Sequence, residues 1–241
     1  MTKQYNKLWV FGDSFTTPNF CVESKDSFWG LTAAAIGAKS IVNCSWPGNC
    51  LTSICHMLIG LQGQYDWEND FFIIGIPPLL RLTVFDNFKD TRHNATHIDT
   101  NTWQSELVQI DCHTGLVNMP VRDIKDLVIY ENSSWTEVQA LNTLFLLSTW
   151  LESKKAKYIV TNLSVPFLKD TNWAPYAFVL PDALANPKYI LHDNTYYSAN
   201  LNIHKPADFD PFEWQGHHGP AGNGHYFDVS VLPTLKRNGF C

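Results

Sequence analysis

Short apolar runs, each closed by a turn residue, constrain the fold of this chain more than any other feature. The run Phe71–Ile76 is apolar throughout and is followed by Pro77 and Pro78. A short strand without polar positions is typical of a parallel sheet that is covered on both faces. Three further runs have the length of strands: Leu8–Phe11, Ser40–Cys44 and Lys157–Thr161.

Helical patterns alternate with these runs. We expect helices over Ser27–Ile36, with Asp26 or Ser27 as the cap and Gly37 as the end, and over Thr52–Leu61. Two later helices are expected: Thr136–Leu151 and His225–Leu235, the second shortened by Pro233. The alternation predicts an α/β fold, namely a three-layer α/β/α flavodoxin-like sheet of about five parallel strands.

Two long stretches of the chain show no clean period. At 241 residues the chain suits a single domain over 1–241. We interpret 82–133 and 167–210 as large insertions, the first as a loop with local structure over one end of the sheet.

Composition excludes several classes of protein. The net charge of −6 argues against nucleic-acid binding, which needs a basic face. The longest other apolar stretches are shorter than the roughly 20 residues that span a membrane, and the polar N-terminus lacks a secretory signal. We therefore expect a cytoplasmic protein without a membrane partner, whose six cysteines are reduced thiols.

The segment after the first strand, Gly12-Asp13-Ser14-Phe15-Thr16, offers a nucleophile. Ligand sites of open α/β sheets lie at the carboxyl ends of the strands, where Ser14 falls. A serine hydroxyl needs a base to take its proton and N–H donors to hold the oxyanion. We expect the Asp13 carboxylate to cap backbone N–H groups of the turn instead of acting as that base.

Candidate partners for Ser14 follow other strands. Gly48 follows the second strand and has a backbone N–H to offer, and His217 and His218 lie in a glycine-rich loop before a helix. Arg81 follows the third strand, where it either holds a substrate carboxylate or phosphate or anchors the insertion by an ion pair. The adjacent histidines form a weak metal motif unless His204 or His225 completes it.

Four segments in order resemble the SGNH/GDSL hydrolases, in the divergent form often seen in bacteriophage genes. They are GDSFT at 12–16, NCSWPGNCLTSI at 43–54, FFIIGIPPLLR at 71–81 and GHHGPAG at 216–222. The resemblance implies that Ser14 is the nucleophile and that its N–H and that of Gly48 hold the oxyanion. It also implies that Asn49 lines the pocket. The spacing of the last block to Gly222 favours His217 over His218 as the base.

Two positions depart from the family pattern. The third block usually reads Gly-x-Asn, and here it reads Gly75-Ile76-Pro77. Asn49 or Asn87 is a candidate substitute for the missing amide. The family also places an Asp two or three residues before the catalytic histidine, where this chain has Trp214 and Gln215. The chemistry is then that of a serine–histidine dyad, or of a triad completed by a nearby carboxylate, Asp210 or Glu213.

We expect a serine esterase or acetylhydrolase that acts on an O-acyl ester of a small molecule or glycan and needs no cofactor. The alternative is a catalytically weak or inactive virion structural or binding protein of a bacteriophage, which would contact other virion proteins. A metal-dependent hydrolase is a third interpretation. For a phage-encoded chain the location would be the host cytoplasm or the virion; the acyl group and the oligomeric state stay open.

Overall fold

A computed structural model describes residues 4–17, 23–47, 49–77, 81–85, 107–111, 133–163, 186–191, 196 and 218–241. Its strands are β1 Lys7–Phe11, β2 Ser40–Asn43, β3 Phe71–Ile76, β4 Arg81–Phe85, β5 Leu107–Asp111, β6 Lys157–Asn162 and β7 Tyr189–Ile190. Its helices are η1 Ser24–Asp26, α1 Phe28–Ile36, α2 Leu51–Gly60, η2 Gln62–Gln64, α3 Ser133–Ser153, α6 Pro220–Tyr226, η8 Phe227–Val231 and α7 Leu232–Arg237.

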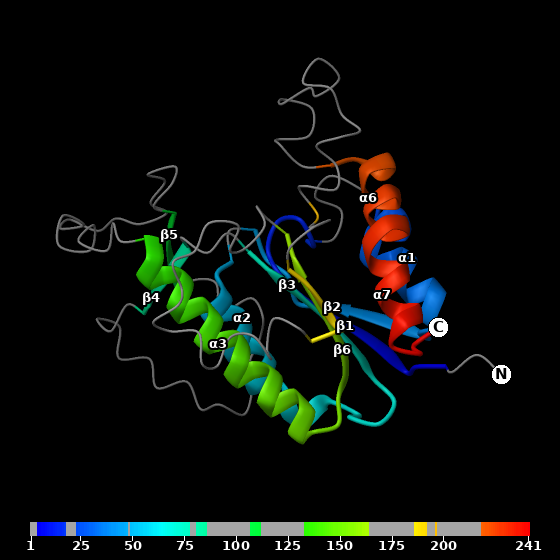
Figure 1. Ribbon diagram of the computed structural model, residues 1–241, viewed down its shortest axis with the longest axis horizontal. Helices are drawn as coiled ribbons and strands as arrows, with labels where there is room; N and C mark the ends of the chain where they lie inside the picture. The colour runs from blue at the N-terminus through cyan, green and yellow to red at the C-terminus, as the bar shows by residue number, and fades with distance from the viewer. Residues whose placement is uncertain are drawn as a thin grey trace, which may run out of the picture.

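The main sheet has five strands in the order β2-β1-β3-β6-β7, and every pair of neighbours is parallel. The second strand along the chain lies at one edge and the first lies beside it, which is the flavodoxin-like order. The predicted fold class is therefore confirmed. Strand β1 lies between β2 and β3, so its carboxyl end is flanked by a strand on each side (Figure 1).

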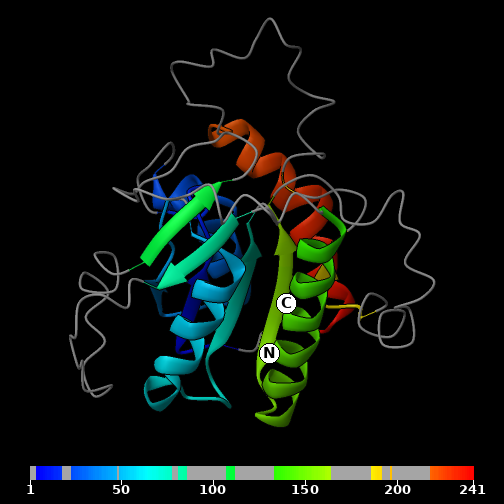
Figure 2. The same ribbon diagram turned by 90° about the vertical axis from the view of Figure 1, so that its left-hand side faces the viewer.

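Helices cover both faces of the sheet. Figures 1 and 2 show α2 and α3 on one face, and α1 with the α6–α7 segment on the other. Successive residues of a strand point to opposite faces. Trp9 and Phe11 accordingly pack in the core under α2 and α3, while Leu8 and Val10 pack under α1 and α7. β1 is thus buried on both sides, and the central strand β3 is buried at every position, as its apolar sequence predicts.

The ends of α1 have local causes. The Ser27 hydroxyl accepts a hydrogen bond from the Gly30 N–H at 3.0 Å, so Ser27, and not Asp26, is the cap. Gly37 ends the helix in the left-handed conformation with φ 65°, which suits glycine. Both features agree with the expected bounds of this helix.

The two irregular stretches contain strands that the sequence did not reveal. β7 lies within 167–210 and pairs with β6, so this stretch supplies the fifth strand of the sheet. Two residues are too few to produce a readable period. β4 and β5 form an antiparallel pair, in which β4 lies at the start of 82–133 and β5 lies within it. β4 lies beside α2 (Figure 2).

The C-terminal helical segment is longer than predicted. It runs from Pro220 to Arg237, and Pro233 does not shorten it. The π-helical turn η8 precedes the proline, and there the Leu232 N–H bonds to the Phe227 carbonyl five residues back. Pro233 therefore falls at the start of a new α-helical register, where its missing N–H costs little. Within the described part of the chain, every helix is too short or too polar to span a bilayer.

Candidate active site

The nucleophile turn, Gly12–Thr17, leaves the carboxyl end of β1. Ser14 is partly exposed, whereas the neighbouring Asp13 is fully buried. The Phe15 N–H donates to Asp13 Oδ1 at 3.0 Å, and the Thr16 N–H donates to the Asp13 carbonyl at 3.0 Å. A Cβ at Gly12 would lie 2.2 Å from Thr16 Oγ1, so the turn requires glycine there. Asp13 thus accepts from backbone N–H, as the sequence predicts.

The segment after β2 holds this turn from the side. The Asn49 amide donates to the Gly12 carbonyl at 3.1 Å, and the Trp46 N–H donates to the same oxygen at 3.3 Å. The Asn43 amide donates to the Thr16 carbonyl at 2.7 Å. The sequence analysis expects the Asn49 side chain to line the pocket. In the structure this side chain is 2% exposed, and one N–H of its amide holds the backbone beside Ser14.

Aromatic contacts connect the nucleophile turn with the loop before α6 that contains His217 and His218, the histidine loop. The Phe15 ring lies 5.3 Å from the Tyr196 ring, and the Tyr196 ring lies 5.1 Å from the His218 ring, centroid to centroid. His218 is 4% exposed. Two segments that lie about 200 residues apart in the sequence therefore both contact Tyr196.

Asn223 is a buried polar residue at this site that the sequence analysis missed. Its amide donates to the His218 carbonyl at 2.9 Å and to the Tyr196 hydroxyl at 3.1 Å, and its side-chain oxygen accepts from the Phe28 N–H at 3.1 Å. Asparagine inside a helix is unfavourable by propensity. The signal in the sequence that could have revealed it is an asparagine five residues after the candidate base His218.

The third block has a proline at the position of the family asparagine. Pro77, which stands where the family pattern has asparagine, is buried and has neither an N–H nor a polar side chain. A Cβ at Gly75 would lie 2.5 Å from Leu163 Cδ1, and the Leu163 N–H donates to the Ile76 carbonyl at 3.0 Å. Apolar packing from the end of β6 therefore adjoins this block.

Several predicted site residues are not placed. Gly48, Asn87, His204, Asp210, Glu213 and His217 lie outside the described residues. The backbone of Arg81 begins β4, in register with Asp111 of β5.

Metal-binding groups and thiols are the other reactive groups to consider among the described residues. Among them, no group of three histidine, cysteine or acidic side chains is placed to hold a metal ion. Burial raises the pKa of the Cys44 and Cys55 thiols to about 12, so both are protonated at neutral pH and poor nucleophiles.

Comparisons with known proteins support the fold. No family model matches the chain, and no curated protein matches it in sequence. Among solved structures, a protein named TesA is similar over 96% of this chain and 99% of its own, with 13% identity and a TM-score of 0.51. A carbohydrate esterase, described as displaying divergent catalytic and non-catalytic binding functions at its active site, is similar over 100% of this chain and 68% of its own, with 13% identity and a TM-score of 0.50. The chain has the α/β fold of the SGNH hydrolases.

Proposed function

We propose that the protein is a serine hydrolase that cleaves O-acyl esters with Ser14 as the nucleophile. One observation carries this proposal. Ser14 is a partly exposed hydroxyl at the carboxyl end of the interior strand β1, on a turn whose carbonyls accept from the half-buried Asn43 amide and the buried Asn49 amide. Such support is what a nucleophile needs to keep one orientation toward its substrate.

In the proposed reaction, Ser14 Oγ attacks the ester carbonyl as its proton passes to the imidazole of His217. The N–H groups of Ser14 and Gly48 hold the oxyanion, and the alcohol leaves with the proton from the imidazolium. Water then hydrolyses the acyl-enzyme by the same steps. His218 is the alternative base, and Asp210 or Glu213 is the candidate carboxylate behind it.

The expected rate is modest because Pro77 supplies no amide to the oxyanion. Loss of one such donor typically lowers kcat about 100- to 1000-fold. We therefore propose an enzyme that is slow on simple esters and depends on substrate binding for its selectivity.

The proposed substrate class is an ester on a sugar ring. Trp46 is 46% exposed, and its backbone N–H donates to the Gly12 carbonyl, two residues before Ser14. An exposed aromatic face beside a nucleophile suits the apolar face of a sugar ring. The similarity in fold to a carbohydrate esterase is consistent with this choice.

The second candidate is a binding protein with little or no catalysis, for which Pro77 is the specific observation. In that case the same surface would bind a glycan or another protein of a virion without cleaving it. The fold accommodates this alternative, since the structurally similar carbohydrate esterase is described as having non-catalytic binding functions as well as catalytic ones.

A pair of serine variants separates the two candidates. Ser14→Ala should abolish labelling by a fluorophosphonate and lower hydrolysis of short acyl esters by at least about 1000-fold. Ser148→Ala is the control, because the buried Ser148 hydroxyl donates to the Leu144 carbonyl of its own helix, α3, and not to the turn. The hydrolase proposal is wrong if the wild-type protein neither labels nor cleaves any ester, and glycan binding in that protein would favour the second candidate.

A further inference from the structure

We propose that Asn223 is a positioning residue that holds the histidine loop in place against the nucleophile turn. The inference rests on the proposed function, since it concerns how the base is presented to Ser14. Asn223 lies in α6 and is 1% exposed, so every polar group of its side chain must be satisfied inside the protein.

The Asn223 amide joins three segments that are distant in sequence. Its oxygen accepts from the N–H of Phe28, the first residue of α1, which has no acceptor within its own helix. Its nitrogen donates to the carbonyls of His218 at 2.9 Å and Gly219 at 3.1 Å. The helix that follows the nucleophile turn and the loop that carries the histidines are thereby fixed to one side chain.

A second path runs through Tyr196. The Asn223 amide donates to the Tyr196 hydroxyl at 3.1 Å, and that hydroxyl donates to the His218 carbonyl at 3.5 Å. The Tyr196 ring contacts both the ring of Phe15, the residue after Ser14, and the His218 ring. Asn223 therefore bonds both to the backbone of the histidine loop and to the tyrosine that contacts the two segments.

These bonds act next to the candidate base. The Asn223 bonds hold the backbone of one candidate base, His218, which directly follows the other, His217, in the sequence. A displacement of about 1 Å in a catalytic group can lower the rate about 100-fold. Loss of the Asn223 donors should consequently lower kcat more than it raises KM.

Asn223→Asp is the sharpest test because it keeps the size of the side chain and its acceptor for Phe28. It replaces the donors with a carboxylate that faces the His218 and Gly219 carbonyls. We expect kcat for a short acyl ester to fall about 10- to 100-fold with KM within about twofold. The added charge should also raise the apparent pKa of the ascending limb of the pH profile, because it favours the imidazolium.

Asn238→Asp is the matched control. The Asn238 amide also donates to two carbonyls, those of Pro187 at 3.0 Å and Thr234 at 2.8 Å, at the far end of the same helical segment. It should leave kcat and the pH profile unchanged. If Asn223→Asp does not fold, Tyr196→Phe, which removes only the hydroxyl, should lower kcat about threefold and move the same limb.

The outcomes separate this inference from the proposed function. If the wild-type protein is not labelled by a fluorophosphonate, the proposed function fails, and NMR titration of the histidine rings then decides the inference without turnover. Altered titration of His217 or His218 in Asn223→Asp but not in Asn238→Asp supports the positioning role. Equal kcat and equal titration in the two variants, or a loss explained by the unfolded fraction alone, would overturn it.

Discussion

The two ends of the parallel sheet use polar side chains in different ways. At the carboxyl end, buried amides donate to backbone carbonyls: Asn49 to Gly12 and Asn223 to His218. Toward the amino end, the Asn238 amide also donates to backbone carbonyls, but other polar side chains bind one another, as where the Trp9 indole donates to Asp70 Oδ2 at 2.8 Å. The first arrangement fixes the shape of loops, and the second fixes strands and helices to each other.

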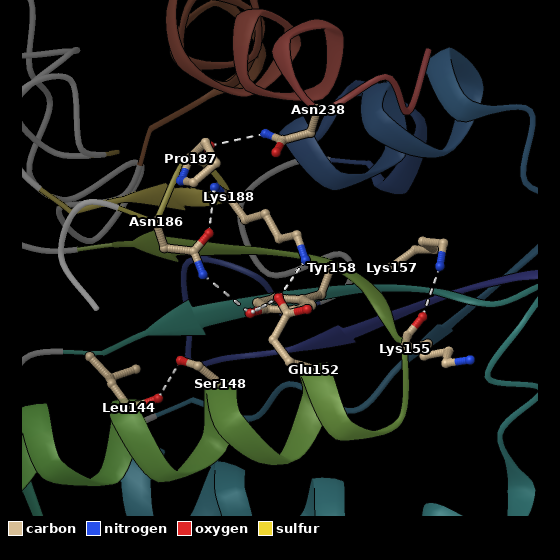
Figure 3. A network of polar contacts seen from close by, with 10 residues as sticks. All are labelled: Leu144, Ser148, Glu152, Lys155, Lys157, Tyr158, Asn186, Pro187, Lys188 and Asn238. Atoms are coloured by element: carbon tan, nitrogen blue, oxygen red, sulfur yellow. Dashed lines mark hydrogen bonds and ion pairs between the residues drawn. The ribbon is translucent and has the colours of Figure 1, made fainter. Parts of the chain in front are cut away.

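The polar cluster at the amino end of β6 shows the second arrangement clearly (Figure 3). Glu152 of α3 accepts from the Tyr158 hydroxyl of β6 at 2.9 Å and pairs with Lys188, just before β7. The Lys188 ammonium also lies 4.6 Å from the centre of the Tyr158 ring. This cluster ties a helix to two strands, whereas the Asn49 amide at the other end holds the backbone two residues before the partly exposed Ser14. In the proposed function, that support serves the nucleophile, and the cluster at the amino end serves stability alone.

The strongest way to break this comparison is to make the same substitution at both ends. Asn49→Asp puts a carboxylate against the Gly12 carbonyl, so it should lower ester hydrolysis about 10- to 100-fold and destabilise the fold by about 1–3 kcal/mol. Asn186→Asp is the matched change at the amino end, where the amide contacts the Tyr158 hydroxyl. It should leave hydrolysis unchanged. Equal kinetic losses, measured alongside thermal unfolding, would show that the two ends do not differ.

Tryptophans at the two ends give a second comparison. Trp46 is 46% exposed beside the nucleophile turn, whereas the partly buried Trp67 packs against the core and edge to face against Trp150 at 5.3 Å. Trp46→Ala should raise KM for a sugar ester about tenfold, the equivalent of roughly 1.4 kcal/mol, with little loss of stability. Trp67→Ala should instead cost about 3 kcal/mol of stability. An unchanged KM for sugar esters in Trp46→Ala would rule out ring stacking.

The parts of the molecule that local sequence determines were predictable. β3 has the bounds Phe71–Ile76 that its apolar run predicts, because a strand buried on both faces leaves no polar interruption. Ser27 and Gly37 bound α1 through contacts with their own neighbours in sequence. The position of Ser14 after β1 follows from the same local pattern.

The parts that depend on distant partners were not predictable. β7 has only two residues and exists because it pairs with β6. Asn223 bonds to Phe28, 195 residues away in the sequence, and no spacing along the chain signals such a contact. For the same reason the sequence could not show that the Asn49 amide would reach the Gly12 carbonyl.

The smallest expected effect concerns the acid stability of the amino end. Partial burial of Glu152 opposes its ionisation, but hydrogen bonds from Lys188 and Tyr158 and the Lys188 charge outweigh burial and hold the pKa of this carboxyl below its usual range. A carboxyl with a lowered folded pKa stabilises the fold above its unfolded pKa of about 4.3. That stabilisation is lost as the pH falls through the folded pKa.

Glu152→Gln should therefore lower the free energy of unfolding at pH 7 by less than about 1 kcal/mol, since the Glu152 side chain is 49% exposed and solvent screens the pair. The difference from wild type should shrink as the pH is lowered below the folded pKa, while ester hydrolysis stays unchanged. Glu23→Gln is the control, because Glu23 pairs with Lys25 at an almost fully solvated site and should have no measurable effect. Urea unfolding from pH 7 to pH 3 measures both variants. The comparison of the two ends assigns the Glu152 pair to stability and not to hydrolysis. A loss of hydrolysis in folded Glu152→Gln would therefore contradict it and would mean that the amino end also supports the chemistry.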